Sequence, residues 1–193
     1  MSLEKIKNLR EKTGAGVVDV KKALDEAGQD EEKALELLRK RGLEKAAKKS
    51  ERTAQEGIVV SYIHGNGKVG AMVKLLCETD FVARNEEFRE LGTDIAMHIT
   101  AMNPKFIRPE DVSLEIIEKE KEIWKEQLEK ENKPENILEQ IMAGKEKKLR
   151  EDLALLSQAF VKNPDETVGD LIAGKIGKIG ENIQVGEFIR FEL

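Results

Sequence analysis

The tetrapeptide Thr79-Asp80-Phe81-Val82 places a carboxylate beside a large aromatic ring, at a point where a loop is expected. It follows the apolar run from Val69 to Cys77 and precedes a helical pattern that begins near Asn85. A corner between a strand and a helix can carry binding residues on a rigid base. Two interpretations are open for this corner: a helix cap followed by a core anchor, or an exposed aromatic wedge with a charged tip.

Residue sets that would support catalysis or metal binding are not found in the sequence. His64 and His98 are the only histidines and Cys77 is the only cysteine, which makes a poor zinc set. The glycine-rich run from Gly174 to Gly180 contains Gly-x-x-Gly-Lys, but it lacks the spacing and the final hydroxyl of a phosphate-binding loop. We therefore expect no enzyme activity, no cofactor and no metal site.

The composition indicates a charge-rich protein with an aliphatic core. Of 193 residues, 39% are hydrophobic, 37% charged and only 4% aromatic, which favours helices and one or two domains. The net charge of −5 argues against broad nucleic-acid binding, so we expect no direct nucleic-acid partner. No apolar run approaches the roughly 18 residues of a membrane span, and no secretory signal or transit segment is recognised at the N-terminus. With a single cysteine, this favours a cytoplasmic, bacterial protein.

The hydrophobic spacing divides the chain into four stretches. Residues 1–52 predict three short helices, broken at Gly14, Gly16 and Gly28. Residues 53–109 predict a hairpin, turning at Gly65-Asn66-Gly67, and then a helix with one apolar stripe. The stripe of that helix consists of Phe88, Leu91, Ile95, Ile99 and Met102.

Residues 110–156 predict a charged helical hairpin, broken at Asn132-Lys133-Pro134 and resembling a thin coiled-coil arm. Its first apolar edge is expected to consist of Ile116, Ile123, Trp124 and Leu128. Residues 157–193 predict a return to strands, with a turn at Asn163-Pro164-Asp165 and a short helix from Thr167 to Ala173. Gly174, Gly177 and Gly180 are then expected to loosen the chain before final strands, in which Ile189, Phe191 and Leu193 share one sheet face.

Several long strings resemble one known family. They include Leu9-Arg10-Glu11-Lys12-Thr13-Gly14-Ala15-Gly16, Thr79-Asp80-Phe81-Val82-Ala83-Arg84-Asn85 and Gly180-Glu181-Asn182-Ile183. In this order, over nearly the whole chain, they resemble the bacterial translation elongation factor Ts family. The resemblance implies an α+β fold: an N-terminal three-helix, ubiquitin-associated-like module, then an antiparallel-sheet core with packed helices and a protruding helical hairpin.

The resemblance also implies a function. Members of this family are guanine-nucleotide exchange factors that bind the GDP form of elongation factor Tu, expel GDP and let GTP enter. The segment Thr79, Asp80, Phe81 and Val82 matches the family segment that dislodges Mg²⁺ in the partner. The positions that match partner-binding residues are Arg10, Val17, Val18, Lys21, Lys22, Ile179 and Gly180. From the residues alone, Val17 and Val18 can be exposed or can belong to the core.

The chain differs from longer family members, because the hairpin segment Ser61-Tyr62-Ile63-His64-Gly65 occurs once and no second copy is found. The resemblance implies that short members supply the missing half from a second chain, so we expect a homodimer. The β edges around residues 158–161 and 183–193 are the first candidate for the pairing surface, and the helical hairpin is the second.

Two alternative functions differ in class from nucleotide exchange. The basic cluster of Arg39-Lys40-Arg41 and residues 45–52 would suit an RNA-binding accessory protein of translation, although the acidic balance and few aromatic rings argue against it. A scaffold would bind the GTPase and leave the release of GDP unchanged.

Overall fold

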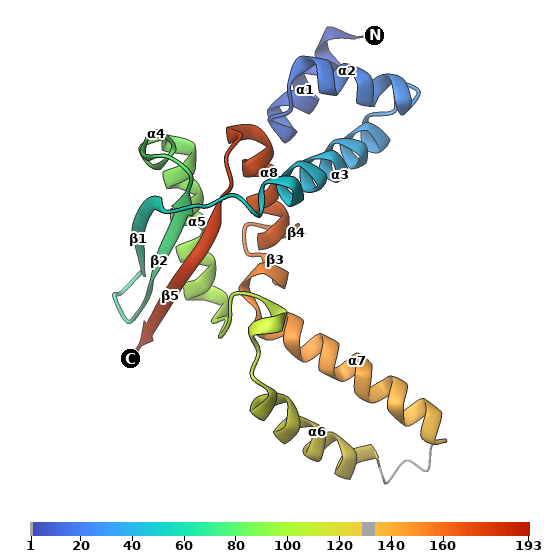
Figure 1. Cartoon of the computed structure of the whole chain (residues 1–193), viewed down its shortest axis with the longest axis vertical. Coiled ribbons are helices and arrows are strands. Elements are labelled where there is room, and N and C mark those ends of the chain that lie inside the picture. Colours follow the sequence, from blue (N-terminus) through green and yellow to red (C-terminus); the bar gives the residue numbers. More distant parts are fainter. Residues whose placement is uncertain (1, 129–133) are drawn as a thin grey trace. The chain divides into compact units, whose positions relative to one another are not determined.

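A computed structural model describes residues 2–128 and 134–193, so the expected break at Asn132-Lys133 lies outside the described residues. The chain forms two compact units, one of Met1–Thr100 with Asp170–Leu193 and the other of Ala101–Gly169. Their elements are labelled in Figure 1. In the part of the chain that the structure describes, no helix is both long and apolar enough to cross a bilayer.

The first unit begins with the three predicted helices, α1 (Leu3–Thr13), α2 (Val17–Glu26) and α3 (Glu31–Lys49). Gly14 ends α1 in the left-handed conformation with φ of 66°, which glycine adopts without steric cost. The Asp30 carboxylate caps α3 by accepting hydrogen bonds from two backbone N–H groups. The small core of this module contains Ile6, Leu9, Val20, Ala23, Leu24, Ala34 and Leu38. The prediction of three helices is confirmed.

A three-stranded antiparallel sheet follows, with the strand order β1-β2-β5. Strands β1 (Glu56–His64) and β2 (Val69–Cys77) pair from Glu56 with Cys77 to His64 with Val69, around the predicted turn. Strand β5 (Gln184–Glu192) pairs with the other edge of β2. This register separates the side chains of each strand onto two faces of the sheet.

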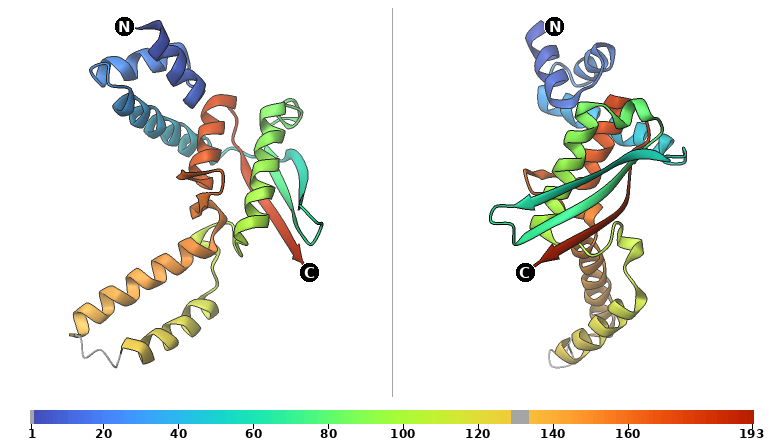
Figure 2. Two further views of the ribbon diagram at one scale, coloured as in Figure 1. Left: turned by 180° about the vertical axis from the view of Figure 1, so that it is seen from behind. Right: turned by 90° about the vertical axis from the view of Figure 1, so that its left-hand side faces the viewer.

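Helix α5 (Glu86–Met102) covers one face of this sheet, as the two views of Figure 2 show. It buries Phe88, Leu91, Ile95 and Ile99 of the predicted stripe, whereas Met102 is exposed. The sheet contributes Ala71, Val73 and Leu75 of β2, all buried. His98 is also buried on α5. The α5–sheet layer is therefore the main aliphatic core of the first unit, and it supports the corner between β2 and α5.

The opposite face of the sheet is exposed and carries an apolar patch beside polar side chains. The patch, here called the outer sheet face, consists of Val59, Ile63, Met72, Ile189 and Phe191, and Ser61, Lys74 and Glu187 lie on the same side of the sheet. The exposed fractions of Ile63 and Phe191 reach 69% and 66%. Ile189 and Phe191 share this face as predicted, and Leu193 follows the end of β5 and is 98% exposed. Contiguous apolar surface of this kind is characteristic of an interaction site.

The second unit contains the predicted helical pair, α6 (Leu114–Leu128) and α7 (Glu135–Leu153), preceded by the 3₁₀ turn η1 (Pro109–Asp111). Lys121 pairs with Glu146 across the two helices, and the Lys145 ammonium lies 5.6 Å from the centre of the Trp124 ring. One predicted edge residue is wrong. Ile117 is buried in place of Ile123, which is 48% exposed, because positions 117, 124 and 128 share one helical stripe.

The last third of the chain departs from the prediction in two places. Asn163-Pro164-Asp165 is not a turn, since Asn163–Thr167 forms strand β4, paired with β3 (Ala159–Phe160). The 3₁₀ turn η3 (Leu155–Ser157) precedes this pair. The expectation that Gly174 and Gly177 loosen the chain is also wrong, because helix α8 (Val168–Ile179) continues through both. Its buried residues Val168, Ile172 and Ile176 recur at helical spacing and outweigh the low helix propensity of glycine.

Candidate functional site

The Thr79–Val82 corner is a single helical turn that displays Phe81. Thr79 is the N-cap of helix α4 (Asp80–Ala83), and its hydroxyl accepts a hydrogen bond from the Val82 N–H. Ala83 is buried and anchors this turn, whereas the Phe81 side chain is 79% exposed. Of the two interpretations left open by the sequence, the structure therefore supports an exposed aromatic residue, with Thr79 as its cap.

Asp80 stands in the first turn of α4, where a carboxylate complements the partial positive charge of the helix end. It forms an ion pair with Arg84 at 3.0 Å, and about half of the Asp80 side chain is exposed. A surface pair of this kind contributes only about 0–1 kcal/mol to stability. Asp80 thus remains accessible to a partner, with its charge only partly screened.

Cys77 lies directly beneath the corner and supports it from the core. Its thiol is fully buried and donates a hydrogen bond to the Thr79 carbonyl at 3.2 Å. Burial raises the pKa of the Cys77 thiol to about 11, and the Glu181 carboxylate contributes to the increase by charge repulsion. The thiol is therefore neutral at physiological pH and acts as a packing group and a donor.

This environment predicts a cysteine that resists alkylation. The reagent attacks the thiolate, and a pKa raised from 9.0 to about 11 keeps the folded thiol protonated at pH 8. We expect iodoacetamide to label Cys77 only as fast as the protein opens, which mass spectrometry measures directly. Because the folded pKa is raised, this group stabilises the fold below about pH 9 and the contribution is lost as the pH rises through 11. Rapid, complete labelling of the folded protein at pH 8 would contradict the buried placement.

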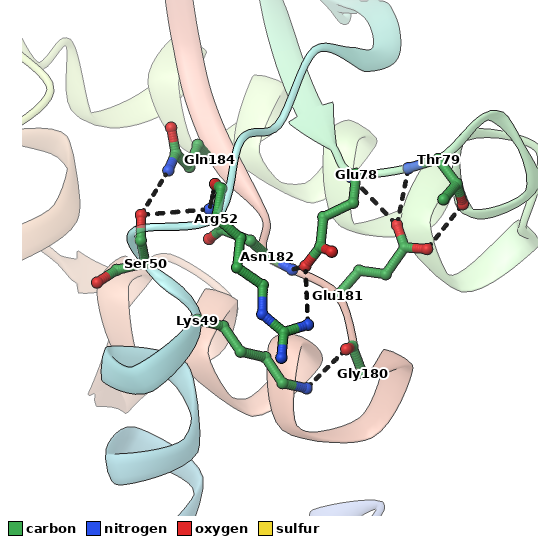
Figure 3. Close-up of polar contacts among 9 residues, drawn as sticks. All are labelled: Lys49, Ser50, Arg52, Glu78, Thr79, Gly180, Glu181, Asn182 and Gln184. Carbon is green, nitrogen blue, oxygen red and sulfur yellow. Dashed lines mark hydrogen bonds and ion pairs between the residues drawn. The ribbon is translucent and has the colours of Figure 1, made fainter.

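Glu181 contacts the corner from a distant part of the chain and was not among the residues predicted from the sequence. Its carboxylate accepts hydrogen bonds from the backbone N–H groups of Glu78 and Thr79 and from the Thr79 hydroxyl (Figure 3). The residues lie 102 positions apart, so no local pattern indicates the contact. The only sequence signal was the string Gly180-Glu181-Asn182-Ile183, which carried the family resemblance without a role for Glu181.

A second set of candidate residues lies on the three-helix module. Arg10, Val17 and Lys21 line one open groove of about 740 Å³, together with Lys178 of α8. Val17 is 40% exposed and Val18 is 65% exposed, so neither belongs to the core. The set is completed by Lys22, which is exposed on α2 and follows Lys21 in the chain. Exposed apolar side chains among basic ones suit a partner surface that is partly apolar and partly acidic.

The remaining candidates, Ile179 and Gly180, form the end of α8 and the residue that follows it. Gly180 has φ of 91°, a conformation that favours glycine, and its carbonyl accepts a hydrogen bond from the Lys49 ammonium at 2.6 Å. Gly180 is also followed directly by Glu181. Gly180 is therefore linked to the Thr79 corner through Glu181, which hydrogen-bonds to Thr79. Arg10, Val17 and Lys21 instead line the separate groove.

Comparisons with known proteins agree on one family. A family model described as "Elongation factor TS" matches residues 22–193. The chain is 53% identical to "Elongation factor Ts" of Thermosipho melanesiensis, over 99% of this chain and 97% of the relative. It is also 53% identical to "Elongation factor Ts" of Carboxydothermus hydrogenoformans, over 97% and 87% of the two chains. The protein of the same name from Fervidobacterium nodosum is 51% identical, over 100% and 98%.

Proposed function

The chain belongs to the elongation factor Ts family, which gives it a role in translation elongation. From this membership we propose that it is a guanine-nucleotide exchange factor for elongation factor Tu. It would bind the GDP form of that GTPase, promote the release of GDP and allow GTP to enter. Such a factor performs no covalent reaction of its own and needs no cofactor. We place its action in the cytoplasm, where translation elongation takes place in bacteria.

The observation that carries this proposal is the exposed Phe81 on a short, capped turn. GTPases of this class hold GDP through a phosphate-binding loop and a Mg²⁺ ion that neutralises the phosphate charge. An aromatic ring inserted between helices of the GTPase would displace the elements that support Mg²⁺. Asp80 would position the ring or compete for nearby polar groups. With the phosphates less neutralised, GDP would bind more weakly.

The magnitude of this effect is consistent with one aromatic residue. Burying a phenylalanine side chain contributes about 1.5–3 kcal/mol. Coupling between two binding sites is typically about 1–3 kcal/mol, or roughly 5- to 150-fold in affinity. Phe81 can therefore supply a typical coupling by itself. A larger acceleration would require additional contacts, for which we propose Arg10, Val17, Val18, Lys21 and Lys22 on the three-helix module, with Ile179 and Gly180.

Release of a fluorescent GDP analogue from elongation factor Tu tests the proposal. The preloaded GTPase is mixed with excess unlabelled GDP, with and without substoichiometric amounts of this protein. We expect faster release with each increment of protein. We also expect a smaller fold acceleration when EDTA has already removed Mg²⁺. Binding to the GTPase without acceleration would instead support the scaffold alternative, and salt-sensitive RNA binding without acceleration would support the RNA-binding alternative.

We further propose that the protein acts as a homodimer that pairs through its sheet. The outer sheet face exposes Val59, Ile63, Met72, Ile189 and Phe191, and β5 is an edge strand with unpaired backbone groups. A second copy would cover this apolar surface and extend the core. A stable interface buries about 800 Å² on each partner, to which five large apolar side chains would contribute a central patch.

Replacing Phe191 by glutamate is expected to dissociate the dimer, because the substitution places a charge in the apolar patch at the β5 edge, where Phe191 is 66% exposed. Light scattering at micromolar concentration should change from twice the chain mass of 21.7 kDa to that mass itself. Leu114→Glu is the matched control for Phe191→Glu, because it places the same charge at a similarly exposed apolar residue on the second candidate surface. Leu114 is 69% exposed on α6 of the helical hairpin. Dissociation by Leu114→Glu alone would move the interface to the hairpin, and a wild-type protein that is monomeric would contradict the homodimer.

Two further assignments from the sequence remain proposals. The likeness of the N-terminal three helices to a ubiquitin-associated module is one of them. The other is the division of the chain into four domains, with bounds 1–52, 53–109, 110–156 and 157–193. These bounds differ from those of the two compact units of the fold.

A further inference from the structure

Phe81 is too exposed for its own packing to determine where it points. Phe81 is 79% exposed, so the rest of the chain covers only about a fifth of its surface. Helix α4 has only four residues, and a single helical turn is not stable by itself in water. The direction of the Phe81 ring therefore depends on the contacts that hold the backbone around α4.

The Glu181 carboxylate provides three of these contacts. One oxygen, Oε2, accepts hydrogen bonds from the backbone N–H groups of Glu78 at 3.1 Å and Thr79 at 3.0 Å. The other oxygen, Oε1, accepts a hydrogen bond from the Thr79 hydroxyl at 2.7 Å (Figure 3). The same hydroxyl accepts from the Val82 N–H and caps α4. One ionised side chain thus fixes the residue on which the turn begins, and hydrogen bonds to an ionised acceptor are stronger than neutral ones.

The loop that carries Glu181 is itself held by hydrogen bonds from Asn182 to Glu78 and to Arg52. The backbone N–H of Asn182 donates to the Glu78 carboxylate at 2.6 Å. The Asn182 side chain is buried and donates to the Arg52 carbonyl at 2.7 Å. Glu78 and Glu181 therefore each use a side chain to bind the backbone of the other segment (Figure 3). This reciprocal arrangement gives Glu181 a rigid base from which to hold Thr79.

We propose that Glu181 is a positioning residue for nucleotide exchange, whose carboxylate fixes Thr79 and thereby the direction in which α4 presents Phe81. The inference rests on the proposed exchange function and adds a residue outside the Thr79–Val82 segment. Glu181 acts through Phe81 and need not touch the GTPase. Its removal should therefore lower the rate of GDP release only where Phe81 is present to be positioned.

A double-mutant cycle between Glu181 and Phe81 tests this dependence. Glu181→Ala, Phe81→Ala and the double variant are compared by the maximal rate of fluorescent GDP release at saturating protein. We expect Glu181→Ala to lower this rate by about 5- to 20-fold, a large part of one typical coupling. In the Phe81→Ala background the same change should have an effect of about two-fold or less, since the effects of two residues that act through one hydrogen-bonded turn are not additive.

Two further variants control for charge and for folding. Glu90→Ala removes an exposed carboxylate from α5 and should leave the release rate unchanged. Glu181→Gln keeps a carbonyl acceptor and a similar shape, so its rate should lie between those of the wild type and Glu181→Ala. If Glu181→Ala is unfolded at the assay temperature, as judged by circular dichroism, Glu181→Gln carries the cycle in its place.

Two results overturn the inference while the exchange function stands. One is an unchanged release rate in Glu181→Ala. The other is an equal loss in the presence and absence of the Phe81 ring, which would mean that Glu181 acts by another route. If the wild-type protein itself fails to accelerate GDP release, the proposed function is overturned and this inference with it, so the two failures are distinguishable.

Discussion

Replacing Phe81 by alanine is expected to lower the maximal acceleration of GDP release by about 5- to 150-fold, the range of a typical coupling between two sites. The Phe81 ring makes little contact within its own chain, since it is 79% exposed. Its removal should change the free energy of unfolding by no more than about 0.5 kcal/mol, as for other surface substitutions. Stopped-flow fluorescence at saturating protein measures the rate, and urea denaturation measures the stability.

Met102→Ala is the matched control for this variant. Met102 is a large apolar side chain, 46% exposed, at the end of α5 opposite the corner. Its truncation should leave GDP release at the wild-type rate. If Phe81→Ala also retained that rate, the exchange function would stand. Its mechanism would then move to the groove that Arg10, Val17 and Lys21 line.

Phe88→Ala should have the opposite profile, with a large effect on folding. Phe88 is fully buried between α5 and the sheet, only seven residues after Phe81. Truncating a buried phenylalanine costs about 3–5 kcal/mol, from lost burial and the cavity that remains. For a chain of this size each 1 kcal/mol lowers Tm by about 2–4 °C. Urea denaturation followed by far-ultraviolet circular dichroism should show an earlier midpoint with a similar slope.

The two phenylalanines together separate a functional from a structural role. Phe81→Ala should lose exchange with an unchanged denaturation midpoint, and Phe88→Ala should retain exchange at temperatures where it stays folded. A denaturation midpoint that barely moves in Phe88→Ala would contradict the packing of α5 on the sheet. A large shift in Phe81→Ala would show that Phe81 is a core anchor.

The sequence was sufficient for elements that are specified by local periodicity. Strand β2 was predicted from its apolar run beside a turn, and helix α5 was predicted from its stripe, because a helix that buries one face fixes the spacing of its apolar residues. The hairpin turn was predicted from the string Gly65-Asn66-Gly67, and the structure gives both glycines a positive φ, a conformation that favours glycine.

Local rules failed where tertiary packing decides the outcome. Gly174 and Gly177 indicated a break, yet α8 continues because its apolar positions are buried against other elements. The prediction for the first helix of the hairpin was wrong for another reason: it assigned Ile123 to the apolar edge and omitted Ile117, although Ile117 shares a helical stripe with Trp124 and Leu128.

The candidate site was predicted in part. The position of the corner followed from the local sequence, whereas the short helix α4 and its cap at Thr79 are seen only in the structure. Whether Phe81 was buried or exposed could not be decided until the sheet and α5 were in place. The role of Glu181 depends on a contact across 102 positions, which only the folded chain reveals.

The affinity of this protein for elongation factor Tu, with and without GDP and Mg²⁺, tests the central claim most directly. Linkage requires that a factor which weakens GDP binding is itself bound more weakly when GDP is present, by the same factor. Isothermal titration calorimetry should give a lower dissociation constant for the nucleotide-free GTPase than for its Mg²⁺–GDP form. The expected difference is about 5- to 150-fold. Equal affinities for the two forms would contradict the exchange function, because a ligand that does not distinguish two states cannot shift their equilibrium.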